Sequence, residues 1–292
     1  MSNVNVFEID PDLVDPVESR KAVLAMQATG FHVLGDGRFE QANDRLICLA
    51  QKIGKPATMT YEDVIFLNNT TGEAPVRVIS ESHDVAEQEA EFYQKHRVIE
   101  NRLFTAVDIL MQNYVYHSHM TYRGRAELTA QMMIEEATDI VRSLYQSLSK
   151  EQFVQFRPFF VGLNGYPGPS GLYSASLPIL DLLVHGGINI DFEEREKMHD
   201  NLEQGLYPSF KNGTLLLETL LNADKPQLDI FPKEKDTLLK RMRAFRQTHR
   251  ESVKKLVPEA MDGTADGSGG MKNVAEYLDS KIVKDDEGEN ND

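Results

Sequence analysis

The sequence predicts an all-α fold. Residues 84–119 and 125–149 carry apolar side chains near the 3.6-residue spacing of an amphipathic helix, and no Pro or Gly interrupts the first of them. Strand signals are scarce along the chain, and no repeat is evident. We therefore expect two long consecutive helices to form the centre of a mostly helical protein.

Shorter helices are expected around this pair. The apolar pattern predicts them at residues 18–28, 172–184, 213–223, 234–257 and 274–282. Ser170 is placed to cap the helix at 172–184, and Pro178 is expected to kink it. Residues 162–171, with the sequence GLNGYPGPSG, hold four glycines and two prolines and are expected to form a loop without regular structure.

This pattern divides the chain into three parts. Residues 1–45 mix Pro and Gly signals with one short helix and are expected to form an N-terminal appendage. Residues 46–283 would form one helical domain, and the acidic residues 284–292 a disordered tail.

Composition limits the classes of function. The 31 Lys and Arg against 46 Asp and Glu give a formal net charge of −15, which argues against a nucleic-acid surface. No run of about 18 apolar residues is present, and residues 1–10 lack the pattern of a secretory signal. We therefore expect a cytoplasmic protein without a membrane span. The single Cys48 excludes an intrachain disulfide and a multi-cysteine metal site.

Of the eight histidines, His249 has the most informative surroundings. It shares a helix face with Phe245 and Val253, so one ring nitrogen could bind a metal or a haem iron. Arg246, one turn earlier, would need an anion if buried, and Asp181, inside the apolar run LPILDLLV, would need a cation. The alternative is that Arg246 and Asp181 are surface charges.

Two other residues have candidate roles. His96 lies beside aromatic residues in EFYQKHRVIE, where it could equally be a solvated helix residue. Arg157 lies among phenylalanines in QFRPFFVGLNG. It could bury its stem and contact a ring, or it could bind a carboxylate in an aromatic pocket.

Two metal patterns are disfavoured. Glu196 and His199 form a Glu-x-x-His unit, but a di-iron bundle needs a second copy, which this chain lacks. His117 and His119 would point away from one another on a helix. No dinucleotide, P-loop or serine-hydrolase motif is present.

Separated stretches of residues 45–282 resemble, in order, the haem-dependent superfamily of indoleamine and tryptophan 2,3-dioxygenases. Its bacterial branch includes haem-dependent tyrosine hydroxylases and the enzyme of the second step of pyrrolnitrin synthesis. The similar stretches are CLAQKIGKPATMTYEDVIFLN (48–68), FYQKHRVIE (92–100), QFVQFRPFFVGLNG (152–165), PSGLYSASLPILDLLVHG (169–186), FRQTHRESVKKLVP (245–258) and GSGGMKNVAEYL (267–278).

The resemblance implies a haem-binding helical bundle and a role for each matching residue. His249 would bind the iron of haem b, with Asp181 paired to Arg246 beside it, and Ser170 and Gly171 would lie over the haem. The roles on the substrate side fall on the following residues: His96 facing the oxidant, Arg157 and Ser268 at the substrate carboxylate, and Phe153, Tyr61 and Val64 around the aromatic ring.

Two departures bear on the reaction. The indoleamine enzymes have a small residue where His96 stands, whereas the hydroxylating branch and the tryptophan dioxygenases have a histidine. A distal histidine can move protons during O–O cleavage, which favours ring hydroxylation. The segment between Gly186 and Glu234 is also shorter than in the indoleamine enzymes.

The resemblance therefore implies a haem-dependent oxygenase that hydroxylates the ring of free L-tyrosine, using O₂ with a reductant or hydrogen peroxide. Tryptophan or an indole derivative is the second substrate class that it allows. The sequence is also compatible with a non-catalytic haem-binding protein of the same fold and with a cofactor-free helical interaction protein. The N-terminal segment is of a kind that can contribute to a homodimer.

Overall fold

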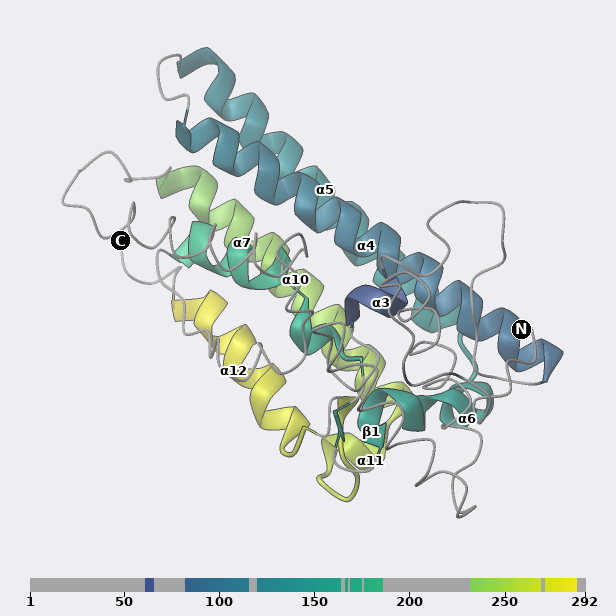
Figure 1. The fold of residues 1–292 in the computed structure, drawn as a ribbon. Coiled ribbons are helices and arrows are strands. Elements are labelled where there is room, and N and C mark those ends of the chain that lie inside the picture. Colours follow the sequence, from purple (N-terminus) through teal and green to yellow (C-terminus); the bar gives the residue numbers. More distant parts are fainter. Residues whose placement is uncertain are drawn as a thin grey trace, which may run out of the picture.

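The computed structural model describes residues 61–65, 82–115, 120–163, 166–167, 169–174, 176–185, 232–268 and 271–287, and these are mostly helical. The appendage at 1–45, the helices expected at 18–28 and 213–223, and both disfavoured metal patterns lie outside these residues. The helices are α3 (Tyr61–Ile65), α4 (His83–Val115), α5 (Met120–Ser147), α6 (Lys150–Val161), α7 (Ser176–His185), α10 (Pro232–Leu256), α11 (Pro258–Met261) and α12 (Val274–Glu287) (Figure 1).

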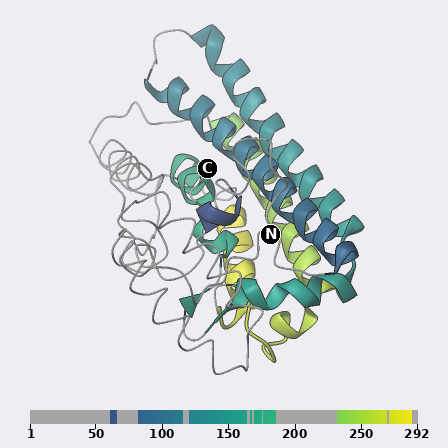
Figure 2. The same cartoon turned by 45° about the vertical axis from the view of Figure 1, so that its right-hand side comes forward.

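The two long helices expected from the apolar periodicity are α4 and α5, which pack side by side (Figures 1 and 2). Their contact buries Leu103 and Leu110 from α4 and Ile134 and Leu144 from α5, all at most 3% exposed. These residues recur at intervals close to whole helical turns, so each helix turns one continuous apolar face to the other.

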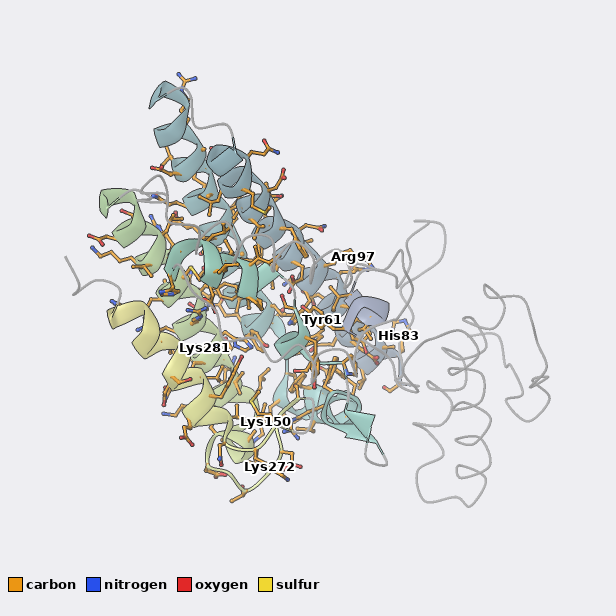
Figure 3. The ribbon with its side chains drawn as sticks, turned by 60° about the vertical axis from the view of Figure 1, so that its left-hand side comes forward. Tyr61, His83, Arg97, Lys150, Lys272 and Lys281 are labelled. Carbon is orange, nitrogen blue, oxygen red and sulfur yellow. The ribbon has the colours of Figure 1, made fainter. Side chains whose placement is uncertain are left out.

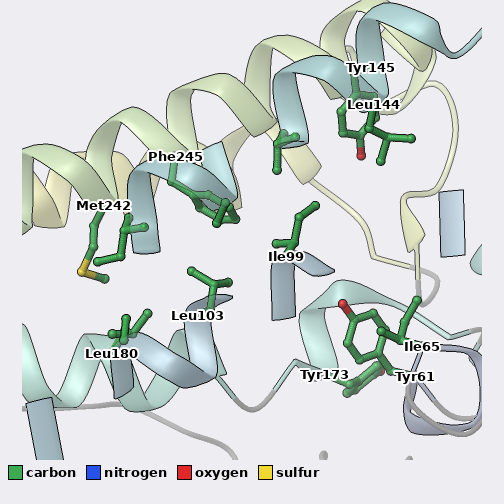
Figure 4. Packing of buried hydrophobic residues seen from close by; sticks show 14 of the residues in the cluster. Tyr61, Ile65, Ile99, Leu103, Leu144, Tyr145, Tyr173, Leu180, Met242 and Phe245 are labelled. Carbon is green, nitrogen blue, oxygen red and sulfur yellow. The ribbon is translucent and has the colours of Figure 1, made fainter. Parts of the chain in front are cut away.

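The helices that follow cover this pair. α10 packs against α5, α7 against α4, and α12 against α10. Met242 and Phe245 point from α10 toward Leu180 of α7 and Leu103 of α4, which closes the apolar core between the helices (Figure 4). Residues far apart in the sequence therefore meet in one interior.

Part of the segment at 162–171 has regular structure, so the expectation of an irregular loop was wrong there. Strand β1 (Gly162–Leu163) pairs antiparallel with β2 (Tyr166–Pro167), with Gly162 opposite Pro167 and Leu163 opposite Tyr166. The sequence between the strands is Asn164-Gly165, a dipeptide that favours two-residue hairpins. That signal was present in the sequence and outweighed the Gly and Pro content.

α7 begins later than expected, and its start corrects the role of Ser170. Residues Gly171–Tyr173 form a 3₁₀ turn, η1, in which the carbonyl oxygen of Ser170 accepts the Tyr173 N–H at 2.9 Å. Ser170 therefore begins this turn and does not cap α7. Pro178 is the third residue of α7, where an N–H would have no helical partner, so its ring requires no kink.

Two other boundaries differ from expectation. α6 was not predicted, and the helix runs through Pro158 to Val161. α12 continues past Ile282 to Glu287, into the segment that we expected to be a disordered tail. Within the described ranges, no helix is both long enough and apolar enough to cross a membrane.

Candidate functional site

His249 lies on the inward side of α10, one turn after Phe245. Its ring centroid is 6.3 Å from that of Tyr145 on α5, in an edge-to-face arrangement. Burial lowers the pKa of His249 to about 4, so the imidazole is neutral at pH 7. Among the described residues, its ring nitrogens have no hydrogen-bond partner. His249 is therefore a neutral imidazole with a lone pair available for a ligand.

His96 lies on α4, and its ring orientation is fixed by two contacts. The ring centroid is 4.1 Å from that of Phe92, and Nδ1 is 2.8 Å from the Phe92 carbonyl oxygen. Because a carbonyl oxygen only accepts, Nδ1 carries the proton in the neutral ring and Nε2 keeps its lone pair. Burial lowers the pKa of His96 to about 4, against the effect of the bond to Phe92.

His249 also affects the protonation of His96. It adds to the lowered pKa of His96, after burial, because two positively charged rings would repel. The rings come from α4 and α10, which are more than one hundred residues apart in the sequence. The fold therefore brings together two of the residues that the sequence selected, both neutral at physiological pH.

Arg246 and Asp181 form a buried ion pair. Arg246 Nη2 donates to Asp181 Oδ1, and Arg246 Nη1 donates to the Lys281 carbonyl oxygen at 3.2 Å. Asp181 is 4% exposed and Arg246 9%, so the alternative that they are surface charges was wrong. His185 Nε2 lies 4.0 Å from the same Asp181 oxygen. The pair joins α7 to α10 and, through Lys281, to α12.

Phe153 belongs to a cluster of aromatic rings between α6 and α4. Its ring centroid is 5.7 Å from Phe92 and 5.2 Å from Phe156. Phe160 adds a contact to Phe92 at 5.2 Å. Since Phe92 also stacks on His96, the cluster gives one side of that histidine an apolar aromatic surrounding.

Arg157 follows Phe153 by one turn of α6 and reaches the loop before α12. The guanidinium is half-buried and donates from Nη2 to the carbonyl oxygen of Asp266. Burial lowers the pKa of Arg157, whereas Glu259 and Asp266 raise it. Ser268, two residues after Asp266, is exposed. Arg157 and Ser268 are thus brought to the same loop, while no contact within the described ranges joins Arg157 to His96.

Glycines shape two loops of the site. Ser170 is 5% exposed, and Gly171 after it is exposed, with no atom within 4 Å of an added Cβ. Gly267 is buried, and its N–H donates to the Met271 carbonyl oxygen at 2.8 Å. A Cβ on Gly267 would lie 2.4 Å from Val274 Cγ2, so glycine permits the close approach of this loop to α12.

Tyr61 and Val64 are both buried, at 5% and 1% exposed, on the short helix α3. α3 is held against α4 near each of its ends (Figure 3). The Tyr61 hydroxyl donates to Glu100 Oε1 at 2.9 Å, and Arg97 Nε donates to the Ile65 carbonyl oxygen at 2.7 Å. A helix of five residues is unstable alone, so these bonds and the buried side chains fix its position.

Glu100 is a buried carboxylate that sequence reasoning missed. It is 2% exposed, and it accepts hydrogen bonds from Tyr61 and, at 2.7 Å, from Ser176 Oγ. Ser174 Oγ lies 3.0 Å from Ser176 Oγ. Burial raises the pKa of Glu100, and the three hydroxyls oppose that effect. The signal was its spacing: Glu100 follows His96 by four residues and precedes Leu103 by three, which places it on the buried face of α4.

No protein-family model matches this chain, and no curated protein is significantly similar to it.

The buried ion pair predicts a large difference between two Asp→Asn variants. Asp181→Asn leaves Arg246 buried without its counter-charge, so we expect a loss of about 3–5 kcal/mol in the free energy of unfolding. The matched control is Asp139→Asn, because Asp139 pairs with Arg142 on the surface, where both side chains are more than half exposed. That change should stay within about 0.5 kcal/mol. Urea denaturation followed by circular dichroism measures both, and equal stability of the two variants would contradict the prediction.

Glu100 predicts a pH dependence of stability. Its pKa is raised in the folded protein above the ordinary value of 4.5, so the folded state binds its proton more tightly than the unfolded state. The stability that Glu100 contributes is therefore fully present below pH 4.5 and is lost as pH rises through the folded pKa. Glu100→Gln removes this titration. We expect the melting temperature of the wild type, relative to this variant, to fall as pH rises above 4.5 through the folded pKa. A relative rise with pH above 4.5 would contradict the prediction.

Proposed function

We propose that the protein is a haem-dependent oxygenase that hydroxylates the ring of a free aromatic L-amino acid, L-tyrosine first. The observation that carries the proposal is the pair of buried, neutral imidazoles of His96 and His249. They come from α4 and α10, and His249 contributes to the lowered pKa of His96. His249 could bind the iron of a haem, and His96 could act as an acid or base.

The residues around His249 fit a haem. A metal binds the neutral form of histidine, and burial keeps His249 neutral. Arg246, one turn earlier on α10, is tied to Asp181, so the rotation of α10 about its axis is set by a bond next to the ligand. Ser170 and Gly171, at the turn before α7, would contact the haem. The haem, when bound, supplies the oxygen chemistry that protein side chains lack.

The residues on the side of His96 would bind and orient the substrate. Phe153, Tyr61 and Val64 are apolar or aromatic side chains suited to the substrate ring. Arg157, helped by Ser268, would bind the carboxylate as a charge-assisted pair, replacing the Asp266 carbonyl that the guanidinium now contacts. His96, with Nδ1 tied to Phe92, would offer Nε2 to receive or donate the proton that the reaction with O₂ or peroxide requires.

The optical spectrum of the protein, expressed with haem supplied, tests the cofactor. We expect a Soret band in the wild type and its loss in His249→Ala, because that change removes the axial ligand. The control is His83→Ala, an exposed histidine at the start of α4, which should keep the band. An unchanged band in His249→Ala would refute the ligand assignment. No band in the wild type would favour the cofactor-free helical protein.

Addition of L-tyrosine and then of L-tryptophan to the haem-loaded protein tests the substrate class. A Soret shift with tyrosine, followed by a product with one added oxygen atom, supports the proposal. A shift with tryptophan alone would move the proposal to an indole substrate. A band that responds to neither amino acid would indicate a haem-binding protein without this chemistry.

Arg157→Leu tests recognition of the carboxylate. The change removes a charge-assisted pair, so we expect the apparent KM for L-tyrosine to rise by roughly one to two orders of magnitude. Arg142→Leu, which removes an exposed arginine of α5, is the matched control and should leave KM unchanged. Steady-state kinetics measure both variants. Equal binding of tyrosine and its decarboxylated amine by the wild type would count against this role of Arg157.

A further inference from the structure

Glu100 connects three elements that surround the proposed substrate site. Its two carboxylate oxygens accept hydrogen bonds from different helices: Tyr61 of α3 at 2.9 Å and Ser176, the first residue of α7, at 2.7 Å. Ser174, in the turn before α7, extends the same group of hydroxyls. The side chain of Glu100 therefore fixes α3 and the start of α7 relative to α4.

Burying a carboxylate between helices costs free energy, because the group loses its hydration. Glu100 is 2% exposed, and within the described residues it has no ion-pair partner. An apolar side chain of similar size would pack these helices together without the loss of hydration that a buried acid suffers. A carboxylate differs in that its hydrogen bonds are directional, so its oxygens fix the positions of the Tyr61 and Ser176 hydroxyl groups. The arrangement suits a residue whose task is to hold a particular side chain in place.

We propose that Glu100 is a positioning residue of the aromatic pocket, which holds the Tyr61 ring where it contacts the bound amino acid. Two hydrogen bonds between α3 and α4, among those of the described side chains, differ in what they hold. The Arg97–Ile65 bond anchors the backbone at the end of the helix, whereas the Glu100–Tyr61 bond fixes the orientation of one ring. This inference rests on the proposed function, because it assigns Tyr61 to the substrate pocket.

The test is a double-mutant cycle on the haem-loaded protein, with the Kd of L-tyrosine measured from the Soret change. Glu100→Gln removes the negative charge from the acceptor of this bond, and Tyr61→Phe removes its donor while keeping the ring. We expect each to weaken tyrosine binding by about tenfold, the factor for one lost charge-assisted hydrogen bond. The double variant should bind no more weakly than the weaker single variant, because both changes remove the same interaction. Haem uptake should be unchanged in all three.

Arg97→Ala is the matched control, since it removes the other bond between α3 and α4. It should leave the Kd within about twofold. An equal loss in Arg97→Ala would overturn the proposal, because general docking of α3 would then explain the effect. Wild-type affinity in Glu100→Gln, or additive losses in the double variant, would also overturn it. If Glu100→Gln does not fold, the comparison of Tyr61→Phe with Arg97→Ala decides.

The outcomes also separate the two proposals. A wild-type protein that takes up no haem defeats the proposed function, and this inference with it. A wild-type protein whose Soret band responds to L-tyrosine, beside a Glu100→Gln variant with the same Kd, defeats this inference alone.

Discussion

The buried pair of Asp181 and Arg246 is the interaction on which the arrangement of the site depends. It joins α7 to α10 inside the protein, where neither charge could remain without the other. Arg246 also holds the C-terminal helix α12 through the Lys281 carbonyl. Because His249 follows Arg246 by three residues, the same contact that satisfies the two charges sets the direction in which His249 points. Apolar packing alone would allow α10 to rotate or slide; an ion pair between two fixed atoms does not.

α4 carries several polar side chains on its buried face. Glu89, Tyr93, His96 and Glu100 follow one another at helical spacing, and Tyr93 donates to Glu89 at 2.5 Å. A core helix optimised only for stability would carry apolar residues at these positions. Local departures of this kind concentrate where a protein gives up stability for a site. His96 thus lies on a helix face that also carries the buried acids Glu89 and Glu100.

Helices with a long periodic pattern of apolar residues could be predicted from the sequence. Features that depend on contacts with distant segments could not. α4, α5 and α10 were predicted because their apolar residues recur over many turns. α6 was missed, and it is held by packing of its phenylalanines against α4, which outweighs the hydrogen bond lost at Pro158. The pairing of Asp181 with Arg246 could be anticipated, since each buried charge needs a partner. Glu100 could not, because its partners come from separate segments that only the folded chain brings together.

The positions of α4 and α10 in the sequence determine the order in which the helices can pack. α4 and α5 are adjacent in sequence, so they can pair soon after both have left the ribosome. α10 reaches its place against α5 only after the long intervening chain has been synthesised. The two histidines therefore meet late, and a cofactor held between them would have no complete binding site on a nascent chain. Such a cofactor would bind only after the whole chain had been synthesised and folded.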